Sequence, residues 1–173
     1  IDETSRTAGQ LLDHAMVSFR TDSLMKEAIK LDELIVDAVH RVSPISELRD
    51  VEIKLQTLDK VVLAGDPILI QNAVQNVLDN AIKYTDSDTT ITVALVRGTE
   101  FAEISICDRG SGFEKNEIIH LLKRFERGKN ASGVVGSGLG LTIVDEIMRA
   151  HDGTVSLQNN KGHGACVILS FPL

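Results

Sequence analysis

Apolar residues recur at helical spacing in five segments of the chain, which predicts five helices. They cover residues 1–20, 32–41, 67–84, 116–125 and 139–151. The first is amphipathic and would need a partner helix for its apolar stripe, and residues 20–23 then break the pattern as a linker would. Asp32 is a candidate N-cap, and Asp66 is another, directly before Pro67 in the first turn of its helix.

Shorter segments alternate between apolar and polar residues and predict strands. They cover residues 28–31, 51–55, 61–63, 90–97, 101–107, 154–158 and 165–171. The turn at Gly98-Thr99-Glu100 joins two of these strands into a hairpin, and the last two strands form a second hairpin. This mixture of helices and hairpins predicts an α+β, two-layer α/β sandwich rather than a doubly wound parallel sheet.

The charge of the chain argues against nucleic acid as a partner. Its 173 residues include 18 Lys and Arg against 25 Asp and Glu, for a formal net charge of −7, whereas duplex binding needs clustered cations. The sequence has no signal peptide and no apolar run of the ~20 residues that span a bilayer. Because the chain begins with Ile rather than Met, we expect a fragment of a longer protein.

The two cysteines, Cys107 and Cys166, both lie in predicted strands. A disulfide framework would have more cysteines, at loop positions, so we expect two buried thiols in a reducing cytoplasm. A metal centre would need further Cys or His close in the sequence, and none is present.

The helix predicted over residues 67–84 carries a row of polar side chains. Asn76, Asn80 and Lys83 share one face, away from the apolar stripe, and Tyr84 lies beside them. One interpretation is a solvated face, although Glu, Lys and Gln would be better helix formers. The other is a ligand site, because an Asn carbonyl oxygen can bind a hard cation and its amide can donate to phosphate.

Two glycine-rich segments follow. DRGSGF, residues 108–113, comes directly after a strand, and GSGLGL, residues 136–141, opens a helix. Alternate glycines let a backbone approach a ligand closely, and a helix N-terminus binds anions. The second segment fits neither a dinucleotide-binding fingerprint nor a P-loop. The ordered set of Asn row, DRGSGF, Phe-Glu-Arg and GSGLGL is more specific than any one of its parts.

This ordered set resembles the ATP-binding catalytic domain of two-component sensor histidine kinases, in the GHKL superfamily shared with gyrase, MutL and heat-shock chaperone ATPases. NVLDNAIKY resembles the N box, DRGSG the first glycine box, FER the F box and GSGLGL the second glycine box. The likeness covers roughly residues 27–173. It implies a mixed, mostly antiparallel sheet covered by about three helices.

The resemblance implies a site for ATP and Mg²⁺. At its phosphate end, Asn80 would bind Mg²⁺, Asn76 and Lys83 would contact phosphate, and Tyr84 would border the nucleotide. Arg127 would reach the γ-phosphate, so that Asn76, Lys83 and Arg127 are the candidate catalytic residues.

The two glycine boxes would bind the rest of the nucleotide. Residues 127–138 would form a lid, and phosphate would be held at the helix that starts near Leu139 by three glycines: Gly136, Gly138 and Gly140. Asp108 would accept a hydrogen bond from the adenine amino group, and Phe113 would line the base. Gly110 and Gly112 would let the chain pass close to it.

Three departures from the family pattern matter. Asn76 stands where the gyrase-like branch has a Glu that activates water, which favours a kinase over a hydrolase. Leu122 stands where the F box usually begins with Phe. Ala165 replaces a usual Thr, so a water-mediated adenine contact would be missing.

No histidine matches the family's phosphoacceptor motif. His14 has no nearby Pro, and His40 is followed by a basic residue, with Pro44 one place too early. A structural or surface role is expected for the other three: His120, His151 and His163.

We therefore expect residues 1–22 to be part of a second dimerisation helix with a linker, and residues 23–173 to be the ATP-binding catalytic domain. The fragment would bind Mg-ATP without labelling itself. It would supply the γ-phosphate to a histidine on a dimerisation helix that it lacks, for relay to an aspartate of a cognate response regulator. The full-length protein would be a homodimer, cytoplasmic or attached to the inner membrane.

Two alternatives stay open. A GHKL serine kinase of the anti-sigma type would share the four boxes, but that class lacks a helix like residues 1–20. A degenerate module that only senses nucleotide is favoured by Leu122 and Ala165 and opposed by the four intact boxes.

Overall fold

The computed structural model describes residues 15–114, 118, 139–160 and 162–173. Its centre is a five-stranded sheet with the strand order β2-β4-β5-β7-β6. The strands are Val51–Leu58 (β2), Thr89–Arg97 (β4), Phe101–Cys107 (β5), Thr154–Asn159 (β6) and Ala165–Pro172 (β7). β2 runs parallel to β4, and the other neighbouring strands are antiparallel. The mixed, mostly antiparallel sheet and its two hairpins are therefore confirmed.

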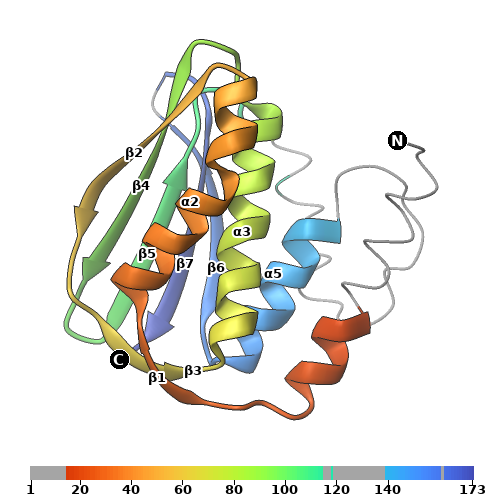
Figure 1. Cartoon of the computed structure of the whole chain (residues 1–173), viewed down its shortest axis with the longest axis vertical. Coiled ribbons are helices and arrows are strands. Elements are labelled where there is room, and N and C mark those ends of the chain that lie inside the picture. The colour runs from red at the N-terminus through yellow and green to blue at the C-terminus, as the bar shows by residue number, and fades with distance from the viewer. Residues whose placement is uncertain (1–14, 115–117, 119–138, 161) are drawn as a thin grey trace.

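Three helices cover one face of this sheet (Figure 1). They are Leu31–Leu48 (α2), Pro67–Tyr84 (α3) and Leu139–Ala150 (α5). Their apolar stripes are buried against inward-facing strand residues, such as Ile91, Val93 and Leu95 of β4. The predicted two-layer α+β sandwich is thus confirmed. The helix expected over 116–125 lies, apart from residue 118, outside the described residues.

The start of α3 follows from its capping residues. Asp66 Oδ1 accepts hydrogen bonds from the backbone N–H groups of Ile68 (3.1 Å) and Leu69 (3.3 Å). Pro67 occupies the first turn, where its missing N–H would have no partner within the helix. The predicted cap and both predicted ends of this helix are confirmed.

The start of α2 differs from the prediction. Its N-cap is Lys30, whose side chain makes no capping hydrogen bond, so Asp32 lies inside the first turn. The carboxylate of Asp32 accepts a 2.6 Å hydrogen bond from Lys60 Nζ instead. The Asp32 side chain, which the local pattern predicted to cap the helix, forms a long-range ion pair with Lys60.

The end of α2 also differs, because the helix continues beyond Arg41, through Pro44, to Leu48. Proline within a helix removes a backbone hydrogen bond and disfavours this continuation. Val42 and Ser46 are nonetheless buried, so the last turns stay packed against the core. Tertiary packing here outweighs the local preference.

A second, two-stranded sheet lies at one end of the helices (Figure 1). It pairs Glu27–Lys30 (β1) with Val62–Gly65 (β3) in antiparallel register. A Cβ on Gly65 would come within 2.7 Å of Ile70 Cδ1 and 3.1 Å of the His151 ring. Glycine therefore lets this sheet pack closely against α3 and the end of α5.

The cysteines correct an expectation, since they are not free thiols. Cys107 at the end of β5 lies directly opposite Cys166 on β7, with the Cα atoms 4.0 Å apart, and the two form a disulfide. They are separated by 59 residues in the sequence and become neighbours only through strand pairing. Counting cysteines and their spacing could not reveal that register.

Residues 15–21 form a helix that contacts α5 and the N-cap of α3. Val17 is buried, Ser18 Oγ donates a 2.7 Å hydrogen bond to Glu146, and Arg20 Nε donates to both carboxylate oxygens of Asp66 (2.9 and 3.1 Å). The helix therefore continues into the segment expected to be a linker. The boundary between residues 22 and 23 remains a prediction. Among the described helices, none has the length and apolar character needed to cross a bilayer.

Candidate functional site

The polar row on α3 faces the first turn of α5. A Cβ on Gly140 would lie 3.3 Å from Asn80 Nδ2 and 3.4 Å from Asn76 Oδ1. The missing side chain at position 140 therefore lets the N-terminus of α5 come close to both amides. The contact joins the N box to the second glycine box, and it sets helix N–H groups beside neutral oxygen ligands.

Asn72 extends the row by one turn and was missed in the sequence. The amide nitrogen of Asn76 donates to the backbone oxygen of Asn72 (2.9 Å) and to its side-chain oxygen (2.7 Å). These two bonds consume the donors of Asn76 and leave its Oδ1 directed towards Gly140. The four-residue spacing of Asn72 and Asn76 was the available signal, because such residues share a helix face. We call Asn72, Asn76 and Asn80 the amide row.

The last turn of α3 carries a cation and an aromatic ring. Lys83 Nζ lies 5.0 Å from the centre of the Tyr84 ring, within the range of a cation–π contact. Both side chains are exposed. They extend the amide row towards the C-terminal end of α3, against which Gly110 of the first glycine box packs.

Asp108 directly follows β5 and is buried. Its Oδ1 accepts hydrogen bonds from the backbone N–H groups of Gly110 (2.9 Å) and Ala165 (3.0 Å). Among the described residues, Oδ2 receives no hydrogen bond. A buried carboxylate with one oxygen held and the other available can accept a hydrogen bond from a ligand N–H group.

Glycines let the first glycine box pack against α3 and β7. A Cβ on Gly110 would collide with the backbone oxygen of Tyr84, and one on Gly164 would collide with the backbone oxygen of Asp108. Gly112 has φ of 75°, in the left-handed region that glycine adopts most easily. Residues 108–113, which we call the Asp108 loop, are therefore held against the end of α3, one helical turn after Asn80.

Two further asparagines support this loop. Asn159 Oδ1 accepts from Phe113 N (2.7 Å), while its Nδ2 donates to Phe113 O (2.8 Å). Asn160 Nδ2 donates to the backbone oxygen of Asp108 at 3.0 Å. The Phe113 side chain is half-buried and packs partly against the core. No sequence signal pointed to Asn159 or Asn160, because their partners, Phe113 and Asp108, follow β5 and are distant in the sequence.

Most of the remaining candidate ATP-binding residues lie outside the part of the chain that the structure describes. Arg127, Gly136 and Gly138, and with them the expected lid over residues 127–138, lie outside the described residues. Leu139 is the first residue of α5. The structure therefore brings together the amide row, Gly140, the end of α3 and the Asp108 loop.

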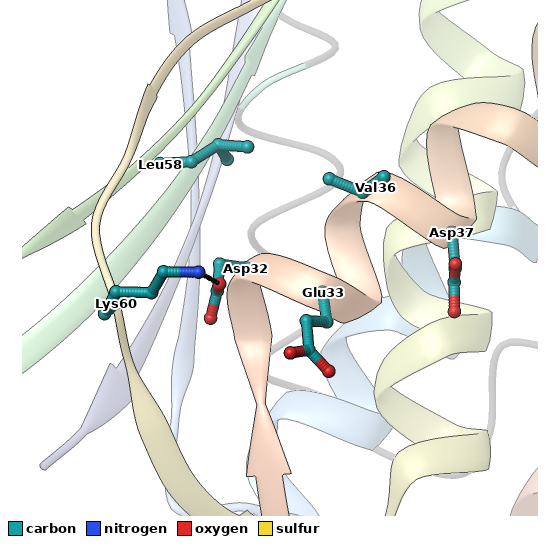
Figure 2. Close-up of a pocket in the computed structure, with 6 residues that line it drawn as sticks. All are labelled: Asp32, Glu33, Val36, Asp37, Leu58 and Lys60. Atoms are coloured by element: carbon teal, nitrogen blue, oxygen red, sulfur yellow. Dashed lines mark hydrogen bonds and ion pairs between the residues drawn. The ribbon is translucent and has the colours of Figure 1, made fainter.

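A separate cavity of about 400 Å³ lies beside the start of α2. Its lining is acidic apart from one lysine and two apolar side chains: Asp32, Glu33, Val36, Asp37, Leu58 and Lys60. Figure 2 shows Lys60 extended to Asp32, where the two make their ion pair. The hydrogen bond from Lys60 lowers the pKa of Asp32, despite an opposing effect of burial. The pair thus neutralises the charge of Asp32 within the protein.

The fold and this site define the class of protein. Residues 65–173 match the model of the histidine kinase-, DNA gyrase B- and HSP90-like ATPase family, and the chain belongs to that family. The resemblance inferred from the four boxes is confirmed.

Similar proteins narrow the class to sensor kinases. The chain is 32% identical over 169 residues to the sensor protein QseC of Salmonella typhimurium, covering 95% of this chain and 36% of that protein. It is 29% identical over 146 residues to the sensor-like histidine kinase SenX3 of Mycobacterium tuberculosis, covering 83% and 36%. The structure of a mycobacterial sensor histidine kinase, MprB, is similar with a TM-score of 0.70 and 27% identity, covering 86% of this chain and 97% of that one. The chain thus spans about a third of the curated relatives' length and corresponds to the ATP-binding catalytic domain of a histidine kinase.

Proposed function

We propose that the chain binds Mg-ATP between the amide row and the Asp108 loop and supplies the γ-phosphate to a histidine on a dimerisation helix. The phosphoryl group would then pass to an aspartate of a response regulator. The observation that carries this proposal is the close approach of Gly110 to the backbone of Tyr84, because it holds the loop that begins at Asp108 against the end of α3, one helical turn after Asn80.

The purine would bind at Asp108. Its Oδ1 is already occupied by Gly110 and Ala165, so Oδ2 is the acceptor left for an adenine amino group. Guanine carries an oxygen at the corresponding position, which a carboxylate would repel. The loop would therefore select adenine over guanine by the polarity of one carboxylate oxygen.

The phosphates would lie along the amide row. Amide oxygens are suitable ligands for a hard cation such as Mg²⁺, and Gly140 brings the N-terminal turn of α5 beside two of these amides. A bound Mg²⁺ would neutralise phosphate charge during transfer. Lys83 at the end of the row adds a positive charge, and we propose that Arg127 adds a second.

The identity of residue 76 favours transfer over hydrolysis. An amide cannot take a proton from water at neutral pH, whereas a carboxylate at this place could. The donors of Asn76 are consumed by Asn72, so its oxygen is the group left to face the ligand. The site therefore positions ATP without activating a water molecule.

The described histidines are poor acceptors for this phosphate. His151 is buried and uses both ring nitrogens, since Nε2 accepts from Asp66 N (2.9 Å) and Nδ1 contacts Ile147 O (2.7 Å). His40 and His163 are exposed, and the sequence around neither resembles an acceptor motif. We propose that the acceptor lies on a separate helix of the same protein.

Two assays test the proposal together. We expect labelled ATP to bind only weakly without Mg²⁺, and the protein to transfer label to an added dimerisation domain that carries a histidine motif. The product should be acid-labile phosphohistidine. An acid-stable phosphoserine product would indicate the anti-sigma class instead. Strong self-labelling of the chain alone would contradict the separate acceptor, and no ATP binding with Mg²⁺ would overturn the proposal.

A further inference from the structure

The disulfide lies on the face of the sheet opposite the helices. Along β5, the inward positions are buried: Ala102, Ile104 and Ile106. Cys107 follows the outward set, like Glu103 and Ser105, and it is only half-buried, whereas Cys166 is 4% exposed. Of the two cysteines, Cys107 is therefore the more exposed to a small molecule in solution.

The disulfide also adjoins the proposed base pocket on both strands. Cys107 directly precedes Asp108, and Cys166 directly follows Ala165. Asp108 and Ala165 are joined by two hydrogen bonds, from Asp108 N to Ala165 O (2.8 Å) and from Ala165 N to Asp108 Oδ1 (3.0 Å). The covalent bond thus sits one residue from the contacts that orient the carboxylate.

We propose that Cys107 and Cys166 form a reversible redox pair that sets the affinity of the base pocket for adenine nucleotides. This inference rests on the proposed function of Asp108. In the disulfide state the ends of β5 and β7 are tied together, and the carboxylate is held ready for the base. In the dithiol state the strand ends are free to separate. Nucleotide binding must then order Asp108, and the conformational entropy lost in doing so lowers the affinity.

The chemistry is thiol–disulfide exchange with a low-molecular-weight disulfide as oxidant. The thiolate of Cys107 attacks the oxidant, whose S–S bond breaks and releases one thiol. Cys166 loses its proton and attacks the mixed disulfide at Cys107 Sγ, which forms the protein disulfide and releases a second thiol. Two protein thiols are oxidised while one small disulfide is reduced to two thiols, and excess small thiol reverses the sequence.

The order of attack is testable by trapping. Cys166→Ala treated with glutathione disulfide should retain one glutathione on Cys107, detected by intact mass. Cys107→Ala should react much more slowly, because the remaining thiol is buried. Equal labelling of the two variants would contradict the assigned roles.

The main experiment measures ATP affinity of the wild-type chain in both states, each verified by intact mass. We expect binding to be about 3- to 10-fold tighter in the disulfide state than in the dithiol state. The Cys107→Ala/Cys166→Ala variant should bind like the reduced protein and be unaffected by oxidant. Cys107→Ala alone, which retains the buried thiol, should behave in the same way and controls for loss of packing at position 166.

Three outcomes would overturn the inference. Equal ATP affinity in the two verified states would reject the redox pair while leaving the proposed function intact. Failure of excess glutathione disulfide to close the bond after reduction would reject its reversibility. Lack of ATP binding in either state would reject the proposed function and the regulation with it.

Discussion

The backbone N–H of Asp66 donates a 2.9 Å hydrogen bond to Nε2 of His151, 85 residues later in the chain. This bond joins the start of α3 to the residue that follows α5, and the two helices run antiparallel (Figure 1). At about 1.5 Å per residue, Asn76 on α3 and Gly140 on α5 both lie roughly 15 to 17 Å from it. The bond therefore sets the helix register that brings Gly140 beside the amide row.

Replacing His151 should destabilise the fold. His151→Leu removes the acceptor and leaves the Asp66 N–H buried without a partner, at a cost of about 1–3 kcal/mol. We expect a matching fall in the free energy of unfolding, measured by urea denaturation. His163→Ala, at an exposed turn position, is the control and should change it by less than about 0.5 kcal/mol. Equal effects of the two substitutions would refute the role assigned to this bond.

Stability should depend on pH through Asp66. Burial alone would raise the pKa of this carboxyl, but hydrogen bonds from Arg20, Leu69 N and Met25 N together bring it below the ordinary value of 3.8. A lowered folded-state pKa means that the ionised group contributes stability above the unfolded-state pKa. That contribution is lost as the pH falls through the folded-state pKa.

Asp66→Asn tests this pH dependence. Near neutral pH the variant should unfold about 1–3 kcal/mol more easily, because it loses the charged bond to Arg20. As the pH falls from about 4 through the lowered folded-state pKa, the difference should shrink, since the wild-type carboxyl becomes protonated over this range. Urea denaturation across this range provides the measurement, with Asp37→Asn on the exposed side of α2 as control. A difference that grows in acid would have the wrong sign.

The fold was largely predictable because its local signals agree with its tertiary structure. The cap at Asp66, the proline after it and the apolar stripe all indicate the same helix, and α3 has the predicted ends. α2 shows the limit, because the pattern ended it before Pro44 while burial of Val42 extends it. Whether packing outweighs a local stop signal depends on partners that the sequence does not identify.

The site was predictable where its residues form ordered motifs and not where they depend on strand register. Asn76, Asn80 and Asp108 were marked by spacing and by their boxes. Asn159, which binds both polar backbone groups of Phe113, and the Cys107–Cys166 disulfide were missed. Both depend on which residues face each other across the β6–β7 hairpin and its neighbour β5, and one-dimensional spacing does not specify that pairing.

Asp108→Asn should weaken adenine recognition. The amide oxygen can still accept from Gly110 and Ala165, but the second position would present N–H donors to the adenine amino group. We expect ATP affinity to fall about 10- to 100-fold, equivalent to roughly 1.4–2.8 kcal/mol. Titration calorimetry with ATP and GTP provides the measurement, and Asp86→Asn at an exposed position is the control. Unchanged preference for ATP over GTP would place the base elsewhere.

Asn80→Ala should remove most of the Mg²⁺ dependence of ATP binding. The alanine loses the amide oxygen proposed as the metal ligand but retains helix propensity, so α3 should stay intact. We expect Mg²⁺ to enhance binding of ATP to the wild type about tenfold more than to the variant, which corresponds to one lost ligand of ~1.4 kcal/mol. Asp37→Ala, on α2, should leave the enhancement unchanged. If Asn80→Ala instead weakens binding equally with and without Mg²⁺, the amide contacts phosphate directly, and the metal must be held by other groups.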